Sequence, residues 1–170
     1  MANTSTTTAT ERQTYLDTFT REAQTTLRVL KAYPADKAGY KPAERSNTAM
    51  QTAWTLVISQ RVTEPIITVP KLIPSAPPSA PADWATLVSS FEQEHKAASK
   101  RLTAMSDAVF QSTFEIAVGK GVTAPVRRAD ALWMMLFDTV HHRGQLSVYL
   151  RATGAKVPSI YGPSGDEPWV

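Results

Sequence analysis

The sequence predicts an all-α fold, a four-helix bundle in which a long crossover connects the second helix to the third. Four segments repeat apolar residues at spacings of three and four, which is typical of amphipathic helices. Between the second and third segments, six prolines fall within seventeen residues, from Pro65 to Pro81, and proline interrupts helices. Neither pair of helices has enough apolar surface to close a core alone, so both pairs are expected in one bundle.

The first two helices are bounded by capping residues and prolines. The first is expected to begin near Thr10, whose spacing to Gln13 fits a capping box, and to end before Pro34. The second is expected to begin after Ser46 or Asn47, since either residue is a good N-cap. Pro65 is expected to end it.

The last two helices follow the proline-rich segment. The third is expected to begin at Asp83, a plausible N-cap, and the fourth to run from about Arg128 to Thr153, with Gly154 placed as a left-handed terminator. Between them, residues 107–126 alternate weakly in polarity around Gly119 and Gly121. A short hairpin and an irregular loop both fit this stretch.

Residues after Gly154 contain three prolines and cannot extend the last helix. Several of them are nevertheless apolar. We expect these to dock across the bundle as a folded tail: Val157, Ile160, Tyr161 and Trp169.

Length and composition limit the class of protein. A chain of 170 residues corresponds to one domain, with residues 1–9 as a flexible N-terminal tail and 10–170 as a single helical domain. The absence of cysteine excludes disulfides, zinc–cysteine sites and thiol nucleophiles. The net charge of +3 is scattered, which argues against a nucleic-acid partner. No apolar run approaches the ~20 residues of a membrane span, and no signal peptide begins the chain, so a soluble cytoplasmic protein is expected.

The fourth helix is apolar on nearly all sides. One stripe includes Leu132 and Leu146, and a second, on roughly the opposite side, includes Phe137 and Val148. A helix of this kind is buried on more than one side, so we expect a homodimer formed through this helix. Gly144 within it indicates a place where two backbones approach closely. A central helix of a monomer is the alternative.

The same helix carries the densest group of polar residues. Asp138 and His142 are four residues apart and therefore lie on one helical face. Together they could hold a zinc, nickel, iron or manganese ion, although a catalytic zinc normally has three protein ligands. A simple carboxylate–imidazole pair is the alternative. His141 lies about 100° around the helix from His142, so the two are not expected to face one site. His95, on the third helix, is expected to be a core or boundary residue.

Longer motifs resemble a known family. Residues 136–167 read LFDTVHHRGQLSVYLRATGAKVPSIYGPSGDE, and KAYPADKAGYKPAERSNTAM precedes an Ala53-Trp54 step in the second helix. Over residues 10–168 the chain resembles the DinB/YfiT-like family. The resemblance implies a four-helix bundle with the crossover described above, usually dimeric, and in many members a divalent metal held by three histidines. Some branches are metal-dependent transferases that use small thiols, and others respond to DNA damage.

The resemblance carries over only partly at the metal ligands. The histidine position on the second helix is Thr55 here, the first histidine position on the last helix is Asp138, and only His142 is retained. A hydroxyl is a poor ligand beside imidazole, so we expect a metal site that is weak or absent. His95 or Glu64 could add a donor, but the sequence places neither.

Three functions follow from these residues. The first is a DinB-like protein with a degenerate metal site, acting as a dimeric small-ligand-binding or stress-related protein. The alternative is a divergent divalent-metal-dependent enzyme, a thiol S-transferase-like enzyme or a hydrolase, using Asp138 and His142. The third, a DNA-associated protein, is disfavoured by the scattered charge.

Overall fold

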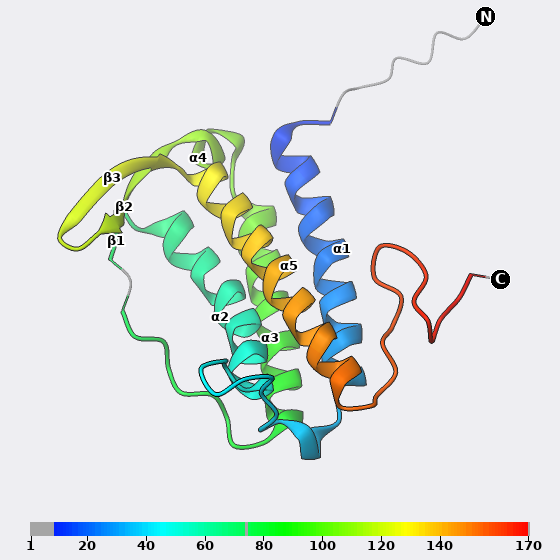
Figure 1. The fold of residues 1–170 in the computed structure, drawn as a ribbon. Coiled ribbons are helices and arrows are strands. Elements are labelled where there is room, and N and C mark those ends of the chain that lie inside the picture. Colours follow the sequence, from blue (N-terminus) through cyan, green and yellow to red (C-terminus); the bar gives the residue numbers. More distant parts are fainter. Residues whose placement is uncertain (1–8, 74, 170) are drawn as a thin grey trace, which may run out of the picture.

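The computed structural model describes residues 9–73 and 75–169, and four long helices form its body (Figure 1). They are α1 (Glu11–Ala32), α2 (Ala49–Thr68), α3 (Trp84–Ala104) and α5 (Arg128–Ala152). Helix α1 packs against α3 and α5, and α2 packs against the same two helices. The predicted four-helix bundle is therefore confirmed. None of the described helices is long and apolar enough to cross a membrane.

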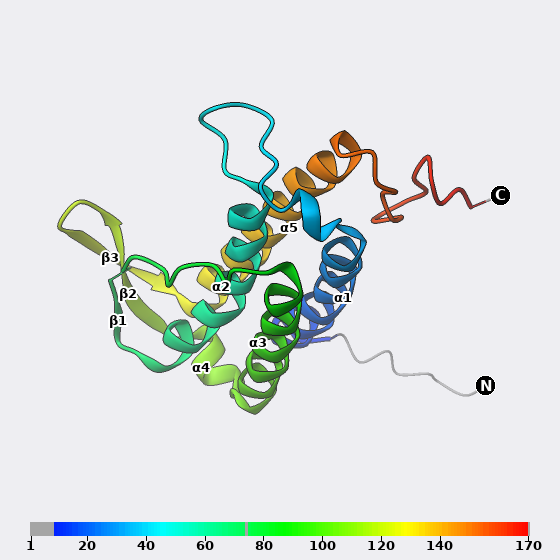
Figure 2. The ribbon, with the colours of Figure 1, turned by 90° about the horizontal axis from the view of Figure 1, so that it is seen from below.

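The connection between α2 and α3 is the predicted long crossover. Helices α2 and α3 run in the same direction, so the chain must return along the whole bundle between them (Figure 1). Figure 2 shows this segment passing across α2 on its way to α3. The Trp54 indole nitrogen donates to the carbonyl of Pro78 at 2.7 Å, which fastens the crossover to α2.

A small sheet adds to the helices at one end of the bundle. After the short helix α4 (Asp107–Gln111), strands β2 (Thr113–Gly119) and β3 (Val122–Arg127) form an antiparallel hairpin. Strand β1 (Lys71–Leu72), within the crossover, pairs in parallel with β2. Gly121 supplies the positive φ of 73° at the turn. Of the two alternatives for residues 107–126, the hairpin is correct, with a helical turn before it.

The N-terminal caps of α1 and α2 agree only in part with the prediction. The Thr10 hydroxyl accepts from the Gln13 amide as predicted, but the Gln13 side chain binds Asp17 and completes no capping box. The N-cap of α2 is Thr48, so the prediction of Ser46 or Asn47 is wrong. Thr48 is favoured because it forms a complete capping box with Gln51, whose side chain accepts from the Thr48 backbone N–H at 2.8 Å.

Helix α2 does not end at Pro65, contrary to the prediction. It continues to Thr68, and the Pro65 carbonyl accepts from the amide of Val69 at 3.1 Å. A proline removes its own N–H donor and crowds the carbonyl four residues earlier, and here two of the carbonyls that follow it have a partner in the chain. The buried Arg128 guanidinium donates to the carbonyls of Ile66 and Val69. The prediction failed because this cap comes from a residue about sixty positions away.

The later helix boundaries agree with the sequence. The Asp83 side chain accepts from the Thr86 amide and caps α3. Helix α5 runs to Ala152, and Gly154 has the expected positive φ of 78°. Residues 1–8 of the expected N-terminal tail lie outside the described residues.

The segment after α5 folds back on the bundle as a tail. Val157 and Ile160 pack against the core, as predicted. Asp166 pairs with Arg151 at 2.5 Å and Glu167 with Arg28 at 2.6 Å. The prediction that Trp169 docks on the bundle is wrong, because this residue is 72% exposed.

A buried ion pair joins this tail to the two helices beneath it. An Arg143 nitrogen lies 2.7 Å from a Glu22 carboxylate oxygen, and their side chains are only 1% and 6% exposed. The Tyr161 hydroxyl donates to the same Glu22 oxygen at 2.7 Å and accepts from Arg143 at 2.5 Å. Although the Tyr161 ring is mostly exposed, burial of its hydroxyl and the bond to Glu22 raise the pKa of Tyr161. The three side chains connect α1, α5 and the tail.

Replacing Glu22 by alanine should destabilise the fold strongly, because it leaves the Arg143 charge buried without its carboxylate. We expect a loss of about 3–5 kcal/mol in the free energy of unfolding, measured by urea denaturation. Glu92→Ala is the matched control, since it breaks an exposed 2.7 Å pair with Lys31 and should cost no more than about 1 kcal/mol. Equal losses in the two variants would contradict this role for the buried pair.

Candidate functional site

Asp138 and His142 converge on α5 as their spacing predicts. The Nε2 atom of His142 lies 3.4 Å from a carboxylate oxygen of Asp138, and the side chains are 19% and 39% exposed. On the other side of the ring, Nδ1 of His142 lies 2.9 Å from the carbonyl oxygen of the Gln145 side chain. Because that oxygen can only accept, Nδ1 is assigned the proton. In the neutral ring, the Nε2 lone pair then faces Asp138.

His141 is an exposed neighbour of His142, in keeping with the expectation that the two rings do not face one site. Its ring centre lies 5.1 Å from that of His142, and its Nε2 accepts from the Gln145 amide nitrogen at 3.0 Å. The two imidazoles leave the helix in different directions, but Gln145 is three residues from one and four from the other. A side chain at these spacings reaches both rings. The sequence places Gln145 in the polar group of this helix but assigns it no role, because a neutral amide carries no signal of its own.

The donor set at this place does not fit a three-ligand metal site. A separation of 3.4 Å suits two ligands of one tetrahedral ion with bonds of ~2.0–2.2 Å. A third donor is missing, since residues 9–73 and 75–169 contain no group of three or more His, Cys, Asp or Glu side chains placed to hold an ion. Thr55, at the family's third position, donates its hydroxyl hydrogen to the Gln51 carbonyl at 3.2 Å.

The two other suggested donors are engaged elsewhere. His95 lies half-buried on α3, with its ring centre 5.1 Å from that of Phe19 and its Nδ1 atom 3.2 Å from the Gln60 side-chain oxygen. Burial lowers the pKa of His95, because it penalises the charged ring. Glu64 lies 3.5 Å from Arg101 on α3. His95 is thus a boundary residue in a polar and aromatic setting, as the sequence suggested.

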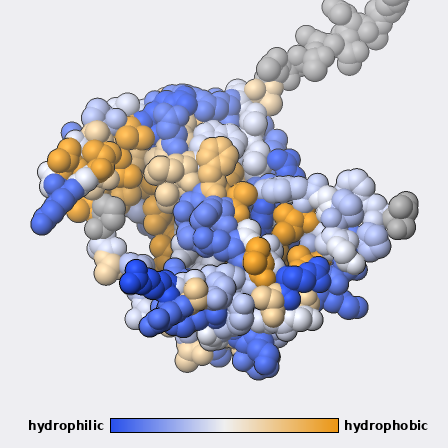
Figure 3. All heavy atoms as spheres, viewed as in Figure 1, coloured by the Kyte–Doolittle hydropathy of each residue, from blue (hydrophilic) through white to orange (hydrophobic). Residues whose placement is uncertain are grey.

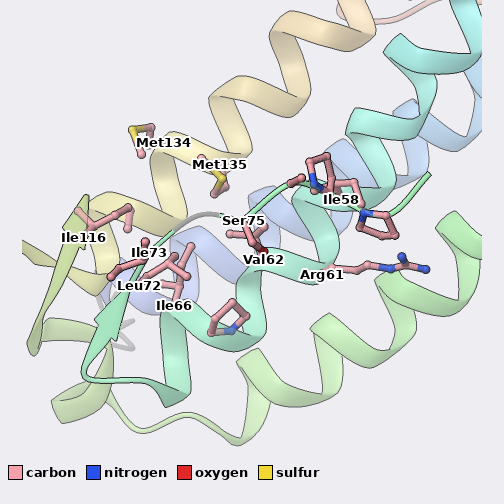
Figure 4. Close-up of a pocket in the computed structure, with 15 residues that line it drawn as sticks. Ile58, Arg61, Val62, Ile66, Leu72, Ile73, Ser75, Ile116, Met134 and Met135 are labelled. Carbon is pink, nitrogen blue, oxygen red and sulfur yellow. The ribbon is translucent and has the colours of Figure 1, made fainter. Parts of the chain in front are cut away.

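A cavity lies between α2, the crossover, the sheet and α5, and is called here the large cleft (Figure 4). It has a volume of about 440 Å³, within the range of ~300–1,000 Å³ typical of small-molecule sites. Its walls are almost entirely apolar. They include Ile58, Val62, Ile66, Leu72, Ile73, Ile116, Met134 and Met135.

One charged side chain borders the large cleft, and its charge is used elsewhere. Arg61 contributes its aliphatic stem, while its guanidinium points away from the apolar side chains (Figure 4). That group pairs with Glu94 of α3 at 2.7 Å and lies over the Trp54 ring at 4.9 Å. The interior therefore offers apolar contacts, and the two methionines give it walls that adapt in shape.

A second cavity, called here the small hollow, lies further toward the beginning of α2. Its volume is about 270 Å³, and it shares Ile58 and Pro77 with the large cleft. The rest of its wall is uncharged and combines apolar surface with polar side chains. It includes Asn47, Gln51, Trp54 and Thr55.

Neither cavity is predictable from the sequence, because their walls come from segments that are far apart in the chain. The large cleft needs the two-residue strand β1, which holds Leu72 opposite Ile116. A strand this short leaves no periodic signal. The sequence feature that points to these cavities is the proline-rich crossover, because so long a connection must lie against a face of the bundle.

One face of α5 remains apolar and open. Met134, Phe137 and Val148 are 50%, 64% and 64% exposed, and a Cβ added at Gly144 would meet nothing within 4 Å in the described structure. Hydrophobic residues also gather at the surface over the sheet end of the bundle (Figure 3). Of the second apolar stripe predicted for this helix, Leu136 is buried, whereas Phe137 and Val148 are uncovered in the single chain.

Comparisons with known proteins agree on the fold. The model of the DinB family matches residues 1–168. A DinB-like protein from Bacillus cereus ATCC 10987 superposes with a TM-score of 0.71 at 21% identity, covering 86% of this chain and 95% of its own. YfiT from Bacillus subtilis, described as a probable metal-dependent hydrolase with an unusual four-helix bundle topology, gives 0.70 at 12% identity, covering 91% and 95%. A putative DinB family member from Exiguobacterium sibiricum 255-15 gives 0.64 at 17% identity, covering 87% and 95%. No curated protein matches the sequence.

Proposed function

We propose a ligand-binding function for this chain, which belongs to the DinB family. The ligand is a small apolar molecule, and its site is the large cleft between α2, α5, the crossover and the sheet. The observation that carries the proposal is a concave space of about 440 Å³ with almost entirely apolar walls. In this proposal, the metal site of the family is degenerate, with Thr55 and Asp138 at two of its three positions.

The large cleft is built to stay open. The Trp54–Pro78 hydrogen bond fixes the crossover at one end, and the pairing of β1 with β2 fixes it at the other. These anchors stop the crossover from collapsing onto α2 and filling the space. A preformed apolar cavity binds apolar molecules because its walls already lack the contacts that a ligand supplies.

Binding in the cleft is tested with cyclohexane as the probe. In protein labelled at isoleucine and methionine methyl groups, we expect NMR shifts at Ile58, Ile66, Ile116 and Met135, with Ile160 in the tail unchanged. Ile116→Trp should fill the cleft and weaken cyclohexane binding at least about tenfold. Val118→Trp, on the same strand but outside the cleft, should leave binding unchanged. Shifts that are absent in the wild-type protein, or equal binding by both variants, would refute the proposal.

Metal content tests the degenerate site directly. For protein purified without a histidine tag, we expect far less than one transition-metal ion per chain by elemental analysis, because two donors hold an ion weakly. The melting temperature should be indifferent to a chelator, and His142→Ala should not change the metal content. One zinc, nickel, iron or manganese ion per chain that is lost in His142→Ala would instead favour a metal-dependent enzyme using Asp138 and His142.

A homodimer through α5 is part of the proposed functional form. Its support is the exposed apolar face that carries Met134, Phe137 and Val148, since soluble proteins seldom leave such a face uncovered. Light scattering after size exclusion should give about twice the chain mass of 18.6 kDa. Phe137→Glu should halve that mass, while Val118→Glu on the exposed hairpin should not. A wild-type protein that is monomeric at tens of micromolar would contradict the dimer.

A further inference from the structure

The large cleft and the small hollow are neighbours along one face of α2. Ile58 and Pro77 line both of them, and the crossover covers both as a common outer wall. Both cavities have mainly apolar walls, but the small hollow has the larger share of polar surface. The walls of the large cleft are almost wholly apolar, whereas Asn47, Gln51 and Thr55 give the small hollow three neutral polar side chains.

We propose that the two cavities form one site for an amphiphile with an uncharged head. The apolar part occupies the large cleft, and the head, a hydroxyl, amide or ester group, lies in the small hollow beside Thr55 and Gln51. This inference rests on the proposed apolar-ligand function and names the class of ligand that the site takes.

The hydrogen-bonding capacity of the small hollow supports a neutral head. The Thr55 hydroxyl already donates its hydrogen to the backbone carbonyl of Gln51. The Thr55 hydroxyl oxygen can still accept a hydrogen bond. The Gln51 side-chain oxygen accepts from the Thr48 backbone N–H as part of the capping box, which fixes the amide in place. The amide nitrogen of Gln51 then remains as a donor. One acceptor and one donor match a hydroxyl or an amide.

Charge argues against an ionised head. No Asp, Glu, Lys or Arg lines the small hollow as described. The nearest arginine on the wall of the large cleft, Arg61, is already neutralised by Glu94 at 2.7 Å. A carboxylate or ammonium group placed in the small hollow would lose part of its hydration without gaining an opposite charge, and that loss is costly.

The test compares four probes by calorimetry and NMR: cyclohexane, 1-octanol, octanoate and octylammonium. We expect 1-octanol to bind at least about tenfold more tightly than either ion, because only its head avoids the desolvation cost of a charge. It should shift the large-cleft methyl groups together with the Thr55 methyl and the Gln51 side-chain amide. Octanoate binding as tightly as 1-octanol would overturn the inference.

A matched pair of variants tests the role of Thr55. Thr55→Val keeps the side-chain shape and removes the hydroxyl, so 1-octanol binding should weaken about 2–10-fold while cyclohexane binding stays unchanged. Thr68→Val is the control, because Thr68 is exposed on the same helix and makes the same type of bond, to the carbonyl of Glu64. If Thr55→Val binds 1-octanol as the wild type does, the head does not lie there. If cyclohexane itself does not bind, the proposed function fails, which is a separate result.

Discussion

The buried pair of Arg143 and Glu22 is the constraint on which the arrangement of the helices depends. A guanidinium in the middle of α5 that is 1% exposed requires a carboxylate beside it, so α1 must lie along α5 with Glu22 at the same level. This contact also fixes the rotation of α5 about its axis. Once Arg143 faces α1, the adjacent helix positions face elsewhere, and Met135 is directed toward α2 and the crossover. The position of the large cleft is therefore tied to a charge pair on another side of the same helix.

The crossover has a comparable influence on the other half of the bundle. Because α2 and α3 run in the same direction, the connection must span the bundle, and its prolines keep it extended and free of helix. An extended segment cannot bury much surface by itself, so it leaves space between its few anchors. The two cavities lie in that space, and they follow from the topology as much as from any individual side chain.

The sequence predicted the elements formed by local rules more fully than the elements formed by distant contacts. Helical periodicity, the Asp83 cap and the glycine at 154 reproduced the bundle because each signal lies within a few residues. The continuation of α2 past Pro65 could not be predicted, because it depends on Arg128. The same applies to the candidate site. The spacing of Asp138 and His142 placed them together, but the Gln145 bridge to His141 depends on side-chain rotamers.

The position of Thr55 connects the degenerate metal site with the cavities. In the family resemblance, this position on the second helix supplies a histidine, and here it carries a hydroxyl on the wall of the small hollow. An imidazole at this position would be a metal ligand. The Thr55 hydroxyl instead donates a hydrogen bond within its own helix, and its oxygen can still accept one. Asp138, the other replaced position, places a carboxylate 3.4 Å from His142, so α5 offers two potential ligands without a third. The Thr55 hydroxyl is satisfied within its own helix, so the bundle can keep its fold without an ion at this position, and in the proposed function its interior serves an uncharged ligand.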